Sequence, residues 1–504
     1  MAKPHYQLLA ESLARAEKKA ANGIIRSEHL SRQDLERLEK DGWLTRIIRG
    51  WYLLNQPVAK DGESTLWYSS FWNFITIYLK FRFGSHYSLS ANASIDMHIG
   101  RTTIPKQLLV MAKKGGSSVI ELPFKTSIVI YQETKTFPQK IEQISGINVI
   151  PLAEALYRAA PAFFKQQPDD AEIALKLVDL TALSRELLSG TNISSANRII
   201  GAYHFLGEKL RSKRLQDNLV AAGYQLKPNN PFIIKTPSSF SSQRIKSPYA
   251  ARIMMMWEKM RSNVLSIFPE DPGLPGASKK YFSELEKIYA NDAYNSLSIE
   301  GYEVNIDLIT RIANGKWNPD QYESDRQQIN AMAAKGYRKA FEAVKRSIDH
   351  IFHKKNPGRI IKEDLHSWYS ALFSPSVKAG ILTPTQLAGY RNDQVYIRNS
   401  MHTPLPVNAI VDAMDALFEC LINESSAAVK AVLGHFIFVF IHPYRDGNGR
   451  IGRFIMNSLF ASGGFPWTIV NVAHREQYIK SLEKASVEQD IAPFAKFILN
   501  EMQQ

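Results

Sequence analysis

The residues best suited to chemistry lie in one short stretch, residues 442–453, which reads HPYRDGNGRIGR. The imidazole of His442 can take a proton from a hydroxyl group near neutral pH. Shortly after it, Asp446 offers a carboxylate, the ligand that Mg²⁺ prefers in combination with phosphate oxygens. The stretch therefore brings a proton acceptor and a ligand for a hard cation close together in sequence.

A glycine-containing turn, Gly447-Asn448-Gly449, follows directly. Glycine tolerates left-handed dihedral angles, so successive N–H groups of the turn can point the same way. Because glycine has no Cβ, phosphate oxygens can come close to those N–H groups. Arg450 and Arg453 are spaced to lie on one face of a helix, where both guanidinium groups can reach a phosphate. The pattern is typical of a site for the phosphates of a nucleotide.

Two helices are expected to position these groups. Residues 427–441 are almost wholly apolar and predict a buried helix that delivers His442, because Pro443 cannot continue its hydrogen bonds. Residues 450–461 predict a second helix, whose N-terminus receives the turn. His435 lies within the first helix, and we interpret it as a core histidine rather than a catalytic one.

The order of residues in this stretch resembles the signature of the Fic family, HxFx(D/E)GNGRxxR, with Tyr444 where the family usually has Phe. The resemblance implies a Fic fold that transfers AMP from ATP to a Tyr, Ser or Thr hydroxyl of a target protein or of the chain itself. It implies His442 as the base and Asp446 as the Mg²⁺ ligand, while the turn and both arginines hold the nucleotide. Relatives that transfer a phosphoryl group carry a Lys in the turn, so Asn448 disfavours that activity.

A second pattern, Ser296 followed by Glu300-Gly301, resembles the inhibitory motif (S/T)xxxE(G/N) of the same family. The resemblance implies that Glu300 pairs with Arg453 and occupies the donor that the γ-phosphate needs. We therefore expect an autoinhibited enzyme. In some Fic enzymes the same glutamate positions a water that removes AMP from a modified protein, so a de-AMPylating enzyme is an alternative.

Two further segments resemble parts of the Fic site. Residues 394–398 are strand-like, and Val395, Tyr396 and Ile397 resemble the β-hairpin flap that binds a target segment by strand addition. Tyr478 lies in a segment similar to the one near the adenine ring. We expect Tyr478 either to border the base or to take part in ordinary helix packing.

The chain is too long for one core, so we expect a multidomain protein. Its parts are a winged helix-like domain (1–58), an α/β regulatory or binding domain (59–235), a Ser/Pro-rich linker (236–277) and a mainly α-helical Fic domain with its inhibitory helix (278–504). In the second part, strands are predicted at residues 118–122, 126–131 and 146–151, and helices at 152–159, 170–188 and 194–215.

The first part has the order of three helical segments and a basic β-hairpin, which is the layout of a winged helix. Ser31 is expected to cap a helix over residues 32–40, and the hairpin turns around Arg49 and Gly50. The side chains expected to point outward from this helix are Arg32, Gln33, Arg37 and Lys40. The pattern resembles the N-terminal domain of AbiEi-like antitoxins, which implies DNA binding through residues 1–60. Packing against another protein is the alternative.

The composition of the chain indicates which class of protein it is and which cellular compartment suits it. The 504 residues are 45% hydrophobic and 22% charged, as in ordinary globular proteins. The one cysteine, Cys420, excludes an intrachain disulfide and a cysteine-based zinc cluster, which fits a reducing cytoplasm. No apolar run is long enough for a signal peptide or a membrane span, so we expect a cytoplasmic protein without a membrane partner.

The formal net charge of +14 fits nucleotide phosphates or DNA without deciding between them. The second alternative function, beside de-AMPylation, is a DNA-binding, antitoxin-like regulator in which Fic activity is secondary. Salt-dependent binding of duplex DNA by the N-terminal part would distinguish it from an enzyme alone.

Overall fold

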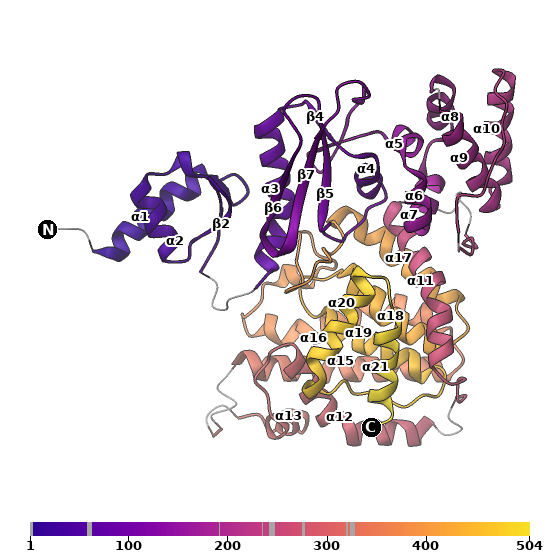
Figure 1. Cartoon of the computed structure of the whole chain (residues 1–504). Coiled ribbons are helices and arrows are strands. Elements are labelled where there is room, and N and C mark those ends of the chain that lie inside the picture. The colour runs from indigo at the N-terminus through magenta and orange to yellow at the C-terminus, as the bar shows by residue number, and fades with distance from the viewer. Residues whose placement is uncertain are drawn as a thin grey trace. The chain divides into compact units, whose positions relative to one another are not determined.

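The computed structural model describes residues 4–57, 63–190, 192–233, 235–240, 247–274, 278–318, 321–322 and 328–504. Its elements divide into two units (Figure 1). Unit 1 consists of Met1–Pro248 and Tyr396–Thr403, and unit 2 of Tyr249–Val395 and Pro404–Gln504. Unit 1 thus includes a short segment that lies within the sequence of unit 2.

Unit 1 begins with a small substructure of helices and a sheet. Its elements are α1 (His5–Lys19), β1 (Ile24–Arg26), η1 (Ser27–His29), α2 (Arg32–Lys40), β2 (Leu44–Ile48) and β3 (Trp51–Leu54). The strands form an antiparallel sheet in the order β1-β3-β2. Ala16, Ile25, Leu38 and Leu44 form the core between helices and sheet. Between the two helices the chain forms β1 and then η1, so the middle helical segment expected from the sequence is a single 3₁₀ turn.

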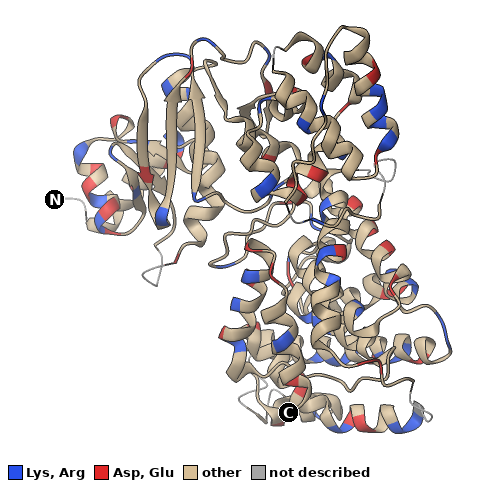
Figure 2. Cartoon of the chain, turned by 45° about the vertical axis from the view of Figure 1, so that its right-hand side comes forward, with Lys and Arg blue, Asp and Glu red and all other residues tan. Residues whose placement is uncertain are grey.

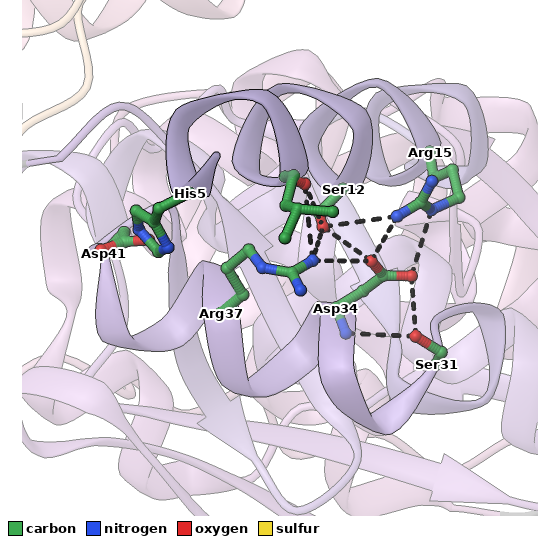
Figure 3. Close-up of polar contacts among 8 residues, drawn as sticks. His5, Ser12, Arg15, Ser31, Asp34, Arg37 and Asp41 are labelled. Carbon is green, nitrogen blue, oxygen red and sulfur yellow. Dashed lines mark hydrogen bonds and ion pairs between the residues drawn. The ribbon is translucent and has the colours of Figure 1, made fainter. Parts of the chain in front are cut away.

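A buried carboxylate joins α1 to α2 (Figure 3). Asp34 accepts hydrogen bonds from Ser12 Oγ at 2.7 Å and from Arg15 Nη2 at 2.6 Å, and Arg15 holds the pKa of Asp34 well below its usual value. Ser31 Oγ accepts from the Asp34 N–H, so Ser31 caps α2 as predicted. Arg37 donates to Ser12 Oγ at 2.6 Å. Arg37 therefore points toward α1, and the expectation that it points outward is wrong.

A mixed sheet follows in unit 1. Its elements are α3 (Thr65–Phe83), β4 (Tyr87–Leu89), α4 (Ala91–His98), β5 (Gln107–Ala112), β6 (Ser118–Leu122), η2 (Pro123–Lys125), β7 (Thr126–Gln132), and a separate hairpin of β8 (Glu142–Ile144) and β9 (Ile147–Val149). The strand order is β4-β5-β7-β6, in which β5 and β7 are parallel and the outer pairs antiparallel. Phe71 and Phe74 of α3 share a core with Ile128 and Ile130 of β7. The three predicted strands correspond to β6, β7 and β9.

Helices complete this part of unit 1. They are α5 (Leu152–Arg158), α6 (Pro161–Gln166), α7 (Pro168–Leu177), α8 (Leu180–Ser189), α9 (Ile193–Phe205) and α10 (Lys209–Ala221). The predicted helix 170–188 is two helices, because Val178 is extended and the Asp179 side chain caps α8. The predicted helix 194–215 is also two, because the chain turns at Gly207, where φ is 75°.

Unit 2 is mainly helical. Its elements are α11 (Pro248–Ile267), α12 (Ser278–Ile299), α13 (Ile306–Ala313), α15 (Gln328–Phe352), α16 (Pro357–Lys378), η4 (Pro384–Leu387), η5 (Val407–Ala409), α17 (Ile410–Asn423), α18 (Ala427–Ile441), α19 (Asn448–Ala461), η6 (Val472–His474), α20 (Arg475–Val487) and α21 (Ala492–Met502). Helix α18 is buried over nearly its whole length and packs against α19. Among the described residues, no helix combines the length and apolar character needed to cross a membrane.

The expected linker is partly regular. Helix α11 lies inside residues 236–277, and its residues Ile253, Met256 and Met260 are buried in the core of unit 2. The reason is that apolar residues recur there at helical spacing. The linker residues 241–246 and 275–277 lie outside the described part of the chain.

The expected β-hairpin flap does not form. Residues 391–405 are all described, and none of them belongs to a strand. An isolated antiparallel bridge between Thr103 and His402 is the one β-type pairing in this stretch. A strand needs a neighbouring strand to pair with. No strand of the described chain pairs with residues 394–398.

Candidate active site

His442 ends helix α18 in a left-handed conformation, with φ 54° and ψ 58°. This conformation is uncommon for a residue other than glycine, and it directs the chain into the turn. The Nδ1 atom of His442 donates to the carbonyl oxygen of Val439 at 3.2 Å, which leaves Nε2 free to accept a proton. Burial lowers the pKa of His442 from 6.5 to about 4. The imidazole is therefore neutral at physiological pH.

The turn after His442 leads into α19 at Gly447, where φ is 81° and no side chain caps the helix. The first N–H groups of α19 are thus available to another acceptor. A Cβ on Gly447 would lie 2.8 Å from the ring of Phe373, and a Cβ on Gly449 would overlap the carboxylate of Glu300. Gly447 thus lets the turn pack closely against Phe373, and Gly449 lets a carboxylate, here that of Glu300, come close to the backbone cradle at the start of α19.

The side chain of Asn448 has a structural role that the sequence did not indicate. Its Oδ1 accepts from the N–H of Tyr444 at 3.0 Å, and its Nδ2 donates to the carbonyl of Tyr444 at 2.8 Å. The Asn448 side chain therefore braces the loop, and only its backbone N–H remains for a phosphate. The ring of Tyr444 stacks on Tyr369 with centroids 3.9 Å apart, so this position packs inward as expected.

Arg453 is held by the C-terminal part of α12. Its Nε donates to Ser296 Oγ at 3.0 Å, and its Nη2 donates to Ser296 O at 2.9 Å and to Glu300 Oε1 at 2.7 Å. The Nη1 atom is buried and has no hydrogen-bond partner within the described residues. That atom would lie 3.2 Å from a Cβ on Gly449. One donor of Arg453 thus faces the turn unpaired, while its neighbour is taken by a carboxylate.

Gly301 explains why α12 ends at this point. Its φ is 88°, its N–H donates to Ser298 O at 3.0 Å, and the N–H of Tyr302 donates to Leu297 O at 3.1 Å. This pair of bonds is typical of a glycine cap at a helix C-terminus. Glu300 is the residue just before the left-handed position, so the cap fixes where its carboxylate lies.

Arg450 and Asp446 form a second ion pair, with Nη2 and Oδ2 3.0 Å apart. The Arg450 side chain is 1% exposed and lies over the rings of Tyr302 and Phe373, whereas that of Asp446 is 60% exposed. Within the described residues, no three His, Cys, Asp or Glu side chains come together as a metal site. A Mg²⁺ ion here would combine one protein carboxylate with nucleotide oxygens, its usual manner of binding.

Tyr478 lies in the core of unit 2. It is 2% exposed, its hydroxyl donates to Nε2 of His435 at 2.8 Å, and its ring packs against Phe494 and Phe497. No face of the ring is open for an adenine base, so the expected stacking is not met and the packing alternative holds. His435 is fully buried, and burial lowers its pKa to about 3, which fits a core histidine.

Arg391 is a residue of this site that the sequence did not indicate. Its Nε donates to the carbonyl of His442 at 2.9 Å, its Nη1 to that of Asp393 at 2.8 Å, and its Nη2 to that of Leu405. It thereby joins the turn to the base of the loop 391–405. Its acceptors are backbone carbonyls, which carry no residue-specific pattern in the sequence.

The predicted flap residues lie in this loop. Val395 and Ile397 are half-buried, whereas Tyr396 between them is 42% exposed. This alternation is typical of extended backbone with two distinct faces. The segment therefore resembles an edge strand without a partner rather than one arm of a hairpin.

Residues 360–460 match the Fic/DOC family, which confirms the resemblance that the motif indicated. Among curated relatives, the protein adenylyltransferase Fic of Culex quinquefasciatus is 28% identical over 246 residues, which are 48% of this chain and 44% of that protein. That of Nematostella vectensis is 33% identical over 119 residues, which are 23% of this chain and 27% of that protein. The chain thus spans less than half the length of these relatives.

Solved structures of Fic proteins also align. The alignment with Fic-1 from C. elegans covers 70% of this chain and 94% of that one, with a TM-score of 0.37 and 16% sequence identity. The alignment with a Fic domain containing signaling protein from Bacteroides thetaiotaomicron covers 49% of this chain and 89% of that one, with a TM-score of 0.33 and 17% sequence identity.

Proposed function

We propose that this protein is a Mg²⁺-dependent protein adenylyltransferase that moves AMP from ATP to a protein hydroxyl, with Glu300 as its inhibitor. The observation that carries the proposal is the guanidinium of Arg453, which has one buried unpaired nitrogen beside Gly449 and another bound to Glu300. An unpaired buried donor is costly, and a phosphate oxygen would supply its acceptor. The names of the curated relatives agree with this activity.

Each residue of the site has its own role in the proposed reaction. The N–H groups of Asn448 and Gly449, with Arg450 and Arg453, bind the phosphates of ATP, whereas the Gly447 N–H donates to Asp446 Oδ1. Asp446 would hold Mg²⁺, which would offset phosphate charge. The target hydroxyl gives its proton to Nε2 of His442 while its oxygen bonds to the α-phosphorus. The bond from that phosphorus to the oxygen bridging to the β-phosphate breaks, and pyrophosphate leaves. Catalysis here is positioning and charge stabilisation.

Glu300 inhibits by competition for one donor. Its Oε1 occupies Nη2 of Arg453, which the γ-phosphate needs, so the triphosphate binds with its α-phosphorus out of line with the attacking oxygen. A hydrogen bond to a charged group is worth about 1.5–3 kcal/mol, which corresponds to roughly ten- to a hundredfold in rate. The Glu300 side chain is 26% exposed, so we expect the lower part of this range.

The test uses ATP labelled at the α-phosphate, with Mg²⁺ and lysate proteins as acceptors. We expect strong protein label with Glu300→Gly, faint label with the parent, and none with Glu300→Gly combined with His442→Ala. Glu303→Gly is the matched control, because Glu303 is exposed in the same segment and should leave the parent level unchanged. Equal label from Glu300→Gly and the parent would reject the inhibitory role, and no label from any variant would reject AMP transfer.

Removal of AMP is the second candidate activity, and one feature of Glu300 favours it. Its Oε1 binds Arg453, whereas no bond to its Oε2 is found within the described residues, so Oε2 can hold a water molecule. Incubation of a labelled, AMP-modified protein with the parent and with Glu300→Gly tests this. Release of AMP by the parent alone would favour de-AMPylation, and equal release by both would exclude a role of Glu300.

We propose that residues 4–57 act as a winged helix, with Arg46 and Arg49 of the β2–β3 hairpin as the DNA contact. Both side chains are exposed. Helix α2 is a weaker candidate, because Arg32 pairs with Glu36 at 2.8 Å and acidic and basic positions alternate along the N-terminal helices (Figure 2). Full-length protein should bind a labelled duplex with a salt dependence that Arg46→Ala with Arg49→Ala reduces and Arg32→Ala does not. No binding at low salt would leave packing against a protein as the role of this domain.

A further inference from the structure

A loop within the Fic part of the sequence belongs to the N-terminal unit. The segment Tyr396–Thr403 is assigned to unit 1, so the chain leaves unit 2 after Val395 and returns at Pro404. The crossing falls inside the predicted target-binding segment, residues 395–397. The contacts that hold this loop therefore decide where that segment can lie.

One set of contacts is made by the residues at the start of α3. The N–H of Ser64 donates to Asn399 Oδ1 at 3.0 Å, and the N–H of Asn399 donates to Thr65 Oγ1 at 2.8 Å. Next to this reciprocal pair, Arg398 forms an ion pair with Glu63 at 3.1 Å. Asn399 has a φ of 55°, a left-handed conformation that asparagine adopts more readily than most residues. The loop is thus anchored directly after Ile397.

A second set is made by the segment before β5. The N–H of Ile104 donates to Met401 O at 2.9 Å, and the N–H of Thr403 donates to Thr102 O at 3.0 Å. His402 is 2% exposed, and its Nδ1 lies 3.0 Å from Thr102 Oγ1. Backbone and side-chain bonds together hold residues 401–403 in an antiparallel bridge.

The other end of the predicted target-binding segment is also fixed. Arg391 binds the carbonyl of His442, and Gln394 Nε2 donates to Val395 O at 3.1 Å and to Pro404 O at 2.9 Å. Residues 395–397 are therefore held on both sides while remaining outside any strand of the described chain. A segment that is held on both sides and lies outside any described strand is suited to pairing with a strand from another molecule.

We propose that residues 63–65 and 102–104 hold the loop that follows the segment 395–397, so that the N-terminal unit lowers the cost of binding a protein substrate at that segment. The inference rests on the proposed function and on the expectation from the sequence that this segment binds an extended stretch of the substrate. Holding the segment before the substrate arrives lowers the ordering cost of strand addition. Residues 63–65 and 102–104 act through the loop and are positioning residues.

The test removes the two side-chain hydroxyls that face the loop, in the Glu300→Gly background of the full chain. Thr65→Val with Thr102→Val abolishes these hydrogen bonds at similar side-chain size. Thr65→Ser with Thr102→Ser keeps the hydroxyls and serves as the rescue. Thr181→Val, at an exposed position of α8, is the control. The measurements are amide hydrogen exchange of residues 397–404, affinity for ATP with Mg²⁺, and AMP transfer at varied concentrations of lysate proteins.

For the valine pair we expect about tenfold faster exchange at residues 397–404 and an about tenfold higher apparent KM for protein acceptors, in keeping with the loss of two hydrogen bonds. Affinity for ATP should stay unchanged, and the serine pair should restore both values. Unchanged exchange, or faster exchange with an unchanged KM, would overturn the inference. If the Glu300→Gly parent labels no protein, the proposed function fails, and exchange alone then decides whether the N-terminal unit holds the segment.

Discussion

Arg453 Nη2 and Glu300 Oε1 lie 2.7 Å apart although 153 positions separate the two residues in sequence. The contact joins the end of α12 to α19, the helix whose N-terminus receives the glycine turn. The same guanidinium has a second nitrogen that is buried and unpaired within the described residues. The guanidinium of Arg453 thus binds a carboxylate of the chain through one nitrogen and keeps another that suits a phosphate oxygen. This arrangement is the physical basis of competition between Glu300 and the nucleotide.

Substitution Glu300→Gln should activate AMP transfer less than Glu300→Gly does. The amide keeps an oxygen that can accept from Arg453 but loses the negative charge, so the competition with the γ-phosphate is weakened and not abolished. We expect an initial rate between those of the parent and Glu300→Gly, about threefold above the parent. A rate of Glu300→Gln below the parent rate would contradict the competition.

Substitution Gly449→Ala should weaken nucleotide binding independently of the inhibitor. Its Cβ would occupy the space that Glu300 Oε1 now fills, at the opening of the backbone cradle. In the Glu300→Gly background, where that carboxylate is gone, we expect affinity for ATP to fall about tenfold, measured by calorimetry. Gly116→Ala is the control, because no atom lies within 4 Å of a Cβ there. Equal affinities for the two variants would show that phosphates do not approach this turn.

The pH dependence of AMP transfer should reflect the low pKa of His442. Burial lowers this pKa from 6.5 to about 4, so the imidazole loses its proton at a lower pH than an ordinary histidine. For the Glu300→Gly protein we expect a rate that is constant from pH 8 down to about 5 and falls as pH passes through about 4. An inflection near 6.5 in the single-turnover rate would contradict the burial of the base.

Asp292 should make the stability of unit 2 depend on pH. Its carboxyl accepts from Trp467 Nε1 at 3.0 Å and from the Tyr337 hydroxyl at 2.6 Å, and burial raises its pKa from 3.8 to about 6. The folded state therefore favours the protonated form, and this contribution to stability is present below pH 3.8 and lost as pH rises through about 6. In Asp292→Asn, Tm should change less between pH 5 and 7 than in the parent. Asp217→Asn, at an exposed position of α10, should keep the parent profile.

Several features that depend on neighbours along the chain were predicted correctly from the sequence. Pro443 and the apolar run before it predicted that α18 ends at His442, and Ser31 predicted the start of α2. These outcomes follow from dihedral preferences and helix periodicity, which act over a few residues. The pairing of Glu300 with Arg453 was predicted as well, because a family motif supplies a long-range partner.

Burial and distant pairing were decided by the tertiary structure. Tyr478 lies in the core instead of at an open site, and Arg37 turns toward α1, because the packing of other helices determines which side chains lose water. Arg391 binds backbone carbonyls far along the chain, which no residue pattern records. The loop after Ile397 pairs with residues of α3 and of the segment before β5, so its partners exist only once the N-terminal unit has folded.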